Sequence, residues 1–126
     1  MSGRVLIFED DRISQKMVRG ALRAAGYETE EVDSGELALQ KVAESTPDLI
    51  VMDVRLPGID GLETARRLKA DPGTAAIPIV AVTAHAMPED ESLILQAGCD
   101  AYMPKPIRFS ALLGVVSDLL AGCQPA

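Results

Sequence analysis

Residues 49–53 read Leu-Ile-Val-Met-Asp, a run of four apolar residues followed directly by a carboxylate. A short apolar run without polar alternation is typical of a strand that is buried on both faces of a parallel sheet. Residues 5–8 and 79–82 form runs of the same kind, and weaker strand patterns cover residues 28–32 and 100–103. The sequence therefore predicts five strands.

The segments between these runs have the periodicity of amphipathic helices, with apolar residues three or four positions apart. Gly26 ends the first such segment and Gly122 follows the last, and glycine is common just beyond a helix C-terminus. The residues expected on the buried faces of these two helices are Ile13, Met17, Val18, Ala21, Leu22 and Ala25, and Leu112, Leu113, Val116, Leu119 and Leu120. The apolar residues of the fourth helical segment are likewise expected in the core.

Several helical segments begin with residues that are typical of helix N-termini. Asp11 and Ser34 each stand where a side-chain oxygen can accept a hydrogen bond from the first turn. Residues 60–63, Asp-Gly-Leu-Glu, form a capping box, and Pro88 suits the first turn of the fourth helix. Strand and helix thus alternate five times, which predicts a parallel α/β sheet with helices on both faces and right-handed crossovers.

Size and composition limit the classes of protein that this chain can be. Its 126 residues, 48% of them hydrophobic, predict one domain spanning residues 1–126 with a core of its own. The formal charge is −7, and no Lys/Arg run offers a basic face for direct binding of nucleic acid. The first apolar run is too short for a signal peptide or a membrane span, so we expect a cytoplasmic protein without membrane contact. Cys99 and Cys123 form neither a disulfide framework nor a zinc motif, and Cys99 is expected to pack as a small apolar residue.

Chemically active side chains follow four of the five predicted strands. Glu9 and Asp10 follow the first, Asp53 ends the third, Thr83 follows the fourth, and Lys105 follows the fifth. Ligands of such sheets bind beyond the carboxyl ends of the strands, so we expect these residues to meet at one edge. Crowded carboxylates repel one another unless a cation offsets their charge, and their oxygens suit Mg²⁺. The pattern therefore predicts a magnesium site of the kind that handles a phosphoryl group.

Five short motifs stand in register with this order of strands and helices. They are Glu-Asp at residues 9–10, Val-Met-Asp at 51–53, Pro-Gly at 57–58, Val-Thr-Ala at 82–84 and Lys-Pro at 105–106. Together they resemble the CheY-like receiver domains of two-component response regulators, over about residues 4–120. The resemblance implies a flavodoxin-like (βα)5 fold, a doubly wound parallel sheet with strand order 2-1-3-4-5. The residues around Thr83 and Lys105 are also similar to single-domain regulators of the DivK kind.

The same resemblance implies a role for each residue at the sheet edge. Asp53 is similar to the phosphoacceptor, which takes a phosphoryl group from a phosphohistidine. Glu9, Asp10, Asp53 and the backbone carbonyl of Arg55 would bind Mg²⁺, although Asp10 could also simply cap the first helix. Lys105 would pair with Asp53 and then with a phosphoryl oxygen, because phosphoryl transfer depends on positioning and charge stabilisation.

Two further pairs of residues are expected to control the phosphorylated state. Thr83 and Tyr102 look like the switch pair, in which the Thr83 hydroxyl turns toward the phosphoryl group and Tyr102 fills the vacated space. Ordinary packing is the alternative for Tyr102. Arg55 and His85 stand where members of the family tune the lifetime of the phosphoryl group, and two solvated side chains are an equally good interpretation.

The expected function is phosphorelay signalling through contact with other proteins. A histidine kinase or histidine phosphotransfer protein would act upstream and a protein target downstream, with the chain as a monomer or a phosphorylation-dependent dimer. It would be no enzyme beyond its own phosphoryl transfer and dephosphorylation. Haloacid dehalogenase-type phosphatases carry an Asp-x-Asp pattern after the first strand, and nucleotide-binding proteins carry a glycine-rich loop there. The sequence has neither pattern after its first predicted strand, which argues against both functions. A constitutive binding module would lack an acid or the lysine, and a receiver cut from a larger hybrid protein remains an alternative.

Overall fold

The computed structural model describes residues 3–54, 61–83, 88–105 and 107–121. Strands and helices alternate along the chain. Their bounds are β1 Arg4–Phe8, α1 Arg12–Ala24, β2 Glu28–Val32, α2 Gly35–Glu44, β3 Leu49–Asp53, α3 Gly61–Ala70, β4 Ile79–Thr83, α4 Pro88–Gln96, β5 Ala101–Pro104 and α5 Phe109–Leu120. All strand pairs are parallel, in the order β2-β1-β3-β4-β5. The predicted doubly wound fold is therefore confirmed, with the last strand shifted by one residue.

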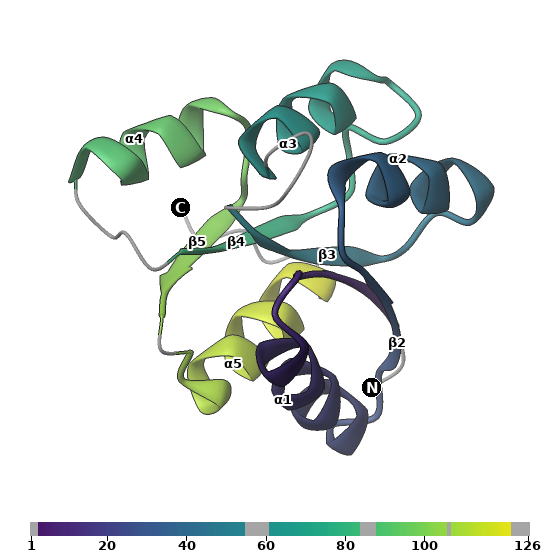
Figure 1. The fold of residues 1–126 in the computed structure, drawn as a ribbon, viewed down its shortest axis with the longest axis vertical. Coiled ribbons are helices and arrows are strands. Elements are labelled where there is room, and N and C mark those ends of the chain that lie inside the picture. Colours follow the sequence, from purple (N-terminus) through teal and green to yellow (C-terminus); the bar gives the residue numbers. More distant parts are fainter. Residues whose placement is uncertain (1–2, 55–60, 84–87, 106, 122–126) are drawn as a thin grey trace.

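Helices cover both faces of the sheet, as Figure 1 shows: α2, α3 and α4 lie on one face and α1 and α5 on the other. Every residue of β3 and β4 is buried. Successive side chains of a strand point to opposite faces, so Ile50 and Met52 enter one core cluster and Leu49 and Val51 the other. The unbroken apolar run of β3 is thus explained, because both of its faces are covered.

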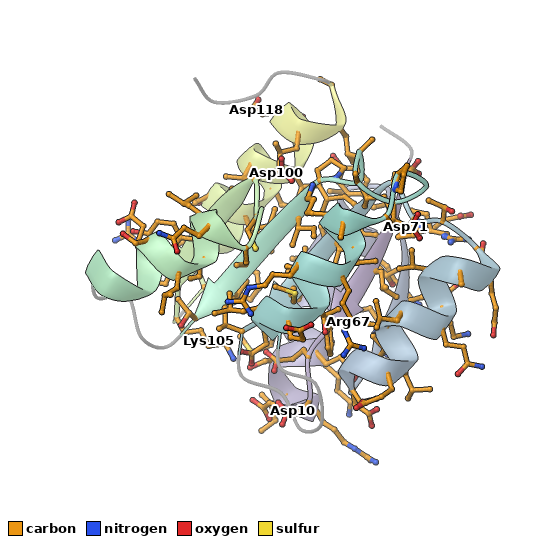
Figure 2. The ribbon with its side chains drawn as sticks, turned by 90° about the horizontal axis from the view of Figure 1, so that it is seen from above. Asp10, Arg67, Asp71, Asp100, Lys105 and Asp118 are labelled. Atoms are coloured by element: carbon orange, nitrogen blue, oxygen red, sulfur yellow. The ribbon has the colours of Figure 1, made fainter. Side chains whose placement is uncertain are left out.

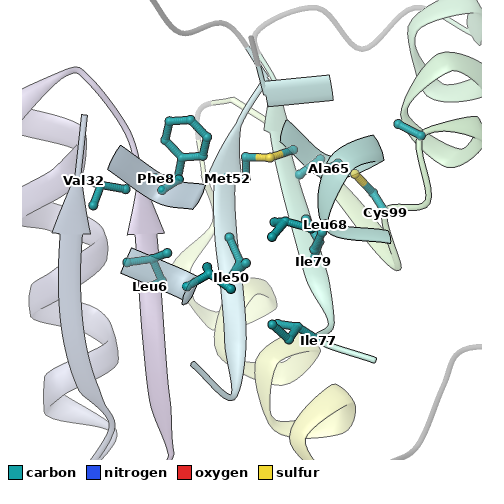
Figure 3. Packing of buried hydrophobic residues seen from close by; sticks show 14 of the residues in the cluster. Leu6, Phe8, Val32, Ile50, Met52, Ala65, Leu68, Ile77, Ile79 and Cys99 are labelled. Atoms are coloured by element: carbon teal, nitrogen blue, oxygen red, sulfur yellow. The ribbon is translucent and has the colours of Figure 1, made fainter. Parts of the chain in front are cut away.

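The cluster under α2, α3 and α4 forms the larger half of the core. Figure 3 shows Phe8, Ile50, Met52 and Ile79 of the three central strands in one cluster with Ala65 and Leu68 of α3. Cys99 belongs to this cluster and is 6% exposed, which confirms its expected apolar packing. Cys123 lies outside the described residues. None of the helices in the described part of the chain is long and apolar enough to cross a bilayer.

The helix ends agree with the local sequence signals. The Asp11 carboxylate accepts a hydrogen bond from the backbone N–H of Ile13 at 3.3 Å, and Ser34 Oγ accepts one from Leu37 at the same distance. Gly26 has φ +98°, a left-handed conformation that glycine adopts without steric cost. The fourth helix begins at Pro88 as predicted, whereas the start of the capping box lies outside the described residues.

The predicted buried face of α1 is wrong at two positions. Val18 and Leu22 are buried, but Ile13 and Met17 are 69% and 52% exposed. Residues one position apart lie about 100° apart around a helix, so the apolar arc of α1 is wider than the strip that contacts the sheet.

The prediction for the fourth helix needs a similar correction. Ile94 is almost fully buried, whereas its neighbours Leu93 and Leu95 are 45% and 50% exposed. Three consecutive helical residues cannot all face one sheet, so only the middle one reaches the core. In α5 the expectation holds, because Leu112, Val116 and Leu119 are buried and Leu113 and Leu120 pack partly against the same cluster.

Candidate functional site

The parallel register brings the carboxyl ends of the central strands to one edge of the sheet. Phe8 at the end of β1 pairs with Met52, and Asp53 at the end of β3 pairs with Val82. Glu9, Asp53 and Thr83 therefore emerge side by side, and all three are buried. Figure 2 shows the exposed Asp10 near Lys105 toward one end of the sheet.

An ammonium group bridges two of the acids at this edge. Lys105 Nζ donates hydrogen bonds to Asp53 Oδ2 at 2.9 Å and to Glu9 Oε1 at 3.0 Å. Glu9 and Asp53 are only 5% and 8% exposed, so their charges are largely removed from bulk water. The backbone N–H of Lys105 donates to the carbonyl of Thr83 at 2.8 Å, which anchors the lysine to the end of β4. The sequence predicted the pairing of Lys105 with Asp53 but not the bond to Glu9.

The charges at the site are not balanced by this one cation. Burial and a hydrogen bond shared with Asp53 raise the pKa of Glu9 to about 7, although Lys105 partly opposes the shift. Burial disfavours the ammonium form of Lys105, yet its hydrogen bonds to Asp53 and Glu9 and their negative charges raise its pKa overall. Without a further cation, the Glu9 carboxyl therefore holds a proton to unusually high pH.

Three carboxylates converge in a way that suits a metal ion. One oxygen each of Glu9, Asp10 and Asp53 lies within 4.8 Å of the other two. Hard oxygen ligands of this kind fit a divalent cation that retains some of its water. Burial is the main cause of the raised pKa of Glu9, and a cation at this position would favour the ionised carboxylate that burial disfavours. The predicted carbonyl ligand of Arg55 lies outside the described residues, as does His85.

The two residues of the predicted switch pair, Thr83 and Tyr102, lie in different surroundings. Tyr102 pairs with Ala81 in the sheet, and Thr83 follows two residues after Ala81, so both side chains belong to the same face. Thr83 is buried at the site, whereas Tyr102 is half-buried and its hydroxyl donates a hydrogen bond to the Glu91 carboxylate of α4. This hydrogen bond raises the pKa of Tyr102. The tyrosine hydroxyl is thus engaged with α4.

Gly61, at the start of α3, contacts the site in a way that the sequence analysis missed. A Cβ atom on this residue would lie 2.4 Å from the backbone oxygen of Asp53 and 2.9 Å from Cα of Val54. Its N–H also donates to the carbonyl of Val54 at 3.0 Å. Any larger residue would displace the backbone that carries Asp53. The only sign of this contact in the sequence is that a glycine stands inside the predicted capping box, directly after its first residue.

Gln15 is the second residue that the sequence analysis missed. Its side-chain Nε2 donates a hydrogen bond to the backbone carbonyl of Glu9 at 3.0 Å, across the loop that joins β1 to α1. The sequence gives no signal for this contact, because it depends on the angle at which the first helix leaves the strand. Asp11 caps α1 as expected and also donates its backbone N–H to Glu9 Oε2 at 3.3 Å.

Comparison with known proteins agrees with this fold and this cluster of residues. The family model described as the response regulator receiver domain matches residues 5–117. The polar-differentiation response regulator DivK of Brucella ovis is 42% identical over 120 residues, which cover 95% of this chain and 98% of that protein.

Solved structures of receiver domains superpose closely. The signal receiver domain of a histidine kinase from Syntrophus aciditrophicus has a TM-score of 0.90 at 33% identity, with 98% of this chain and 94% of that chain covered. The receiver domain of a sensor histidine kinase from Pseudomonas aeruginosa PAO1, crystallised with a magnesium ion in its active-site cleft, has a TM-score of 0.89 at 30% identity, covering 96% and 99%. Both the sequence and the fold thus place the chain in two-component signalling rather than among metabolic enzymes. The chain belongs to the receiver domain family of response regulators.

Proposed function

We propose that Asp53 accepts a phosphoryl group from a phosphohistidine and that the chain signals by phosphorylation-dependent contact with other proteins. The observation that carries this proposal is the environment of Asp53. Asp53 is 8% exposed, and its carboxylate lies 2.9 Å from the Lys105 ammonium and shares a cluster with two other acids. A nucleophile of this kind needs a nearby cation to offset the charge of the incoming phosphoryl oxygens.

Mg²⁺ is the cation that we assign to the carboxylate cluster. Glu9, Asp10 and Asp53 would hold it together with the backbone carbonyl of Arg55, and the observed convergence of the three acids supports this assignment. When bound, Mg²⁺ would neutralise charge on the phosphoryl oxygens. The magnesium ion in the cleft of the Pseudomonas receiver domain is consistent with the same choice of metal.

The residues of the chain would then act in sequence on the phosphoryl group. A carboxylate oxygen of Asp53 forms the new bond to phosphorus while the bond from phosphorus to the donor histidine nitrogen breaks, and the electron pair of that bond stays on the imidazole. Lys105 transfers its hydrogen bond from the Asp53 carboxylate to a phosphoryl oxygen. This movement is short, because Nζ already touches both Asp53 and Glu9.

Water would later hydrolyse the acyl phosphate, so the chain would catalyse its own dephosphorylation. Arg55 and His85 flank the site in sequence, and we propose that they set the access of this water. The double variant Arg55→Ala, His85→Ala should lose its phosphoryl group at an altered rate. An unchanged rate of dephosphorylation would show that both are solvated side chains without this role.

The switch proposal concerns Thr83 and Tyr102. The buried Thr83 hydroxyl would turn toward the phosphoryl group, and Tyr102 would leave Glu91 and move inward. The change would reach the surface formed by α4, β5 and α5, because Tyr102 packs against the core cluster that α4 covers.

Phosphorylation should therefore shift the ring resonances of Tyr102 in an NMR spectrum, together with amide resonances of α4. The shift should be lost in Thr83→Ala even when that variant is phosphorylated to the same extent, because the hydroxyl that would turn toward the phosphoryl group is missing. A Tyr102 ring that shifts equally in both proteins would contradict coupling through Thr83.

The partners follow from the proposed chemistry. A histidine kinase or a histidine phosphotransfer protein would supply the phosphoryl group in the cytoplasm, and a protein target would read the altered surface. We propose that residues 1–126 act as one receiver domain, either as a monomer or as a phosphorylation-dependent dimer. We propose that the domain makes no direct contact with nucleic acid or membrane. A receiver that works without phosphorylation is the competing function.

The central experiment measures the intact mass of the protein after incubation with acetyl phosphate, with and without Mg²⁺. We expect a gain of one phosphoryl group that requires Mg²⁺ and is absent in Asp53→Asn. Asp118→Asn, an exposed carboxylate on α5, is the matched control and should be labelled like the original protein. If the folded protein gains no mass while another response regulator is labelled in parallel, the proposal is wrong and a constitutive binding module is favoured.

The raised pKa of Glu9 predicts a pH dependence of stability in the absence of metal. Between about pH 4.5 and pH 7 the unfolded chain loses this proton while the folded protein keeps it, so the free energy of unfolding falls as pH rises through this window. The loss should amount to roughly 1–3 kcal/mol and then stay constant above pH 7. Urea titrations across this range measure it.

Two comparisons isolate the contribution of Glu9. In Glu9→Gln the fall in the free energy of unfolding between pH 4.5 and pH 7 should be smaller by the contribution of Glu9. The control variant Glu28→Gln, at an exposed glutamate of β2, should behave like the original protein. Millimolar Mg²⁺ should also reduce the fall, because it stabilises the ionised folded form. Parallel pH profiles for the original protein and Glu9→Gln would show that the Glu9 pKa is not raised.

A further inference from the structure

We propose that Gln15 is a positioning residue for the metal site, because its side chain fixes the peptide group that joins Glu9 to Asp10. This inference rests on the proposed magnesium site and adds a residue of α1 that does not itself touch the metal. The hydrogen bond from Gln15 Nε2 to the Glu9 carbonyl, at 3.0 Å, is the observation behind it.

The backbone around Glu9 is held from two sides. The N–H of Glu9 donates to the Val32 carbonyl of β2 at 3.0 Å, although β1 has already ended at Phe8. The carbonyl of Glu9 accepts from Gln15, whose own backbone N–H donates to the Asp11 carbonyl at 2.9 Å in the first turn of α1. Gln15 therefore ties the end of β1 to a well-anchored helical turn.

This tie matters most for Asp10. The peptide unit is planar, so a fixed Glu9 carbonyl also fixes the direction of the Asp10 N–H and the position of its Cα. The Asp10 side chain is exposed, and among the described residues its carboxylate takes part in no hydrogen bond or ion pair. The position of this carboxylate relative to the other two acids is thus set through its backbone.

The other two acids have anchors of their own. Lys105 holds the carboxylates of both Glu9 and Asp53, and the backbone N–H of Asp11 also donates to Glu9 at 3.3 Å. Loss of the Gln15 hydrogen bond would leave these anchors intact and free the peptide before Asp10 to rotate. Part of the metal-binding free energy would then be used to restore its orientation.

Gln15→Met tests the proposal, because methionine matches glutamine in length and helix propensity but cannot donate the hydrogen bond. Gln40→Met is the matched control. Gln40 lies exposed on α2 and donates to Glu44 at 3.1 Å, on a helix that supplies no residue to the site. Gln15→Asn is a second test variant, since it keeps the amide but is too short to reach the Glu9 carbonyl.

The measurement is a titration of unphosphorylated protein with MgCl2, followed by the amide NMR shifts of residues at the site. Gln15→Met and Gln15→Asn should each raise the Mg²⁺ dissociation constant roughly 3- to 10-fold, which is the effect of losing one hydrogen bond. Gln40→Met should leave it unchanged. At saturating Mg²⁺ all three variants should accept a phosphoryl group from acetyl phosphate at nearly the original rate.

Two outcomes would overturn the inference, and they are distinguishable. If the original protein binds Mg²⁺ and the Gln15 variants bind it equally well but melt at lower temperature, the hydrogen bond is merely structural and the inference alone fails. If the original protein shows no saturable Mg²⁺ binding, the proposed metal site fails and the inference falls with it.

Discussion

The hydrogen bonds from the Lys105 ammonium to Asp53 and Glu9 are the interaction on which the rest of the site depends. Two carboxylates that are this deeply buried would repel each other strongly without a cation between them. Lys105 reaches them from the far side of β4, so a single side chain links the ends of β1, β3 and β5. One positive charge does not balance three carboxylates, which makes the site suitable for a divalent cation. Burial, together with the hydrogen bond shared with Asp53, raises the pKa of Glu9.

The apolar strands supply stabilisation that offsets the free-energy cost of this concentration of charge. Each residue of β3 and β4 is buried, and burial of a large aliphatic side chain stabilises the fold by about 1.5–3 kcal/mol. This stabilisation offsets the cost of placing desolvated acids at the carboxyl ends of the same strands. The core and the site are therefore parts of one arrangement, because the strand that buries Met52 also delivers Asp53 to the edge.

Two contacts through the backbone refine the position of the acids. Gly61 lets α3 approach the backbone of Asp53 and Val54 more closely than any side chain would allow. Gln15 holds the Glu9 carbonyl from the opposite face, where α1 packs. Helices on both faces of the sheet thus constrain the carboxylates, so a small shift of either helix would reach the site through main-chain atoms.

The sequence by itself determined the succession of strands and helices, their caps at Asp11 and Ser34, and the set of residues that meet at the sheet edge. These features depend on local periodicity and on the rule that parallel strands end together. The exposure of Ile13 and Met17, the second bond of Lys105 to Glu9, and the contacts of Gly61 and Gln15 were decided only by the tertiary structure. Periodicity specifies which face of a helix is apolar, whereas the width of the contact strip and the angle at which a helix meets the sheet arise from packing between segments far apart in the chain.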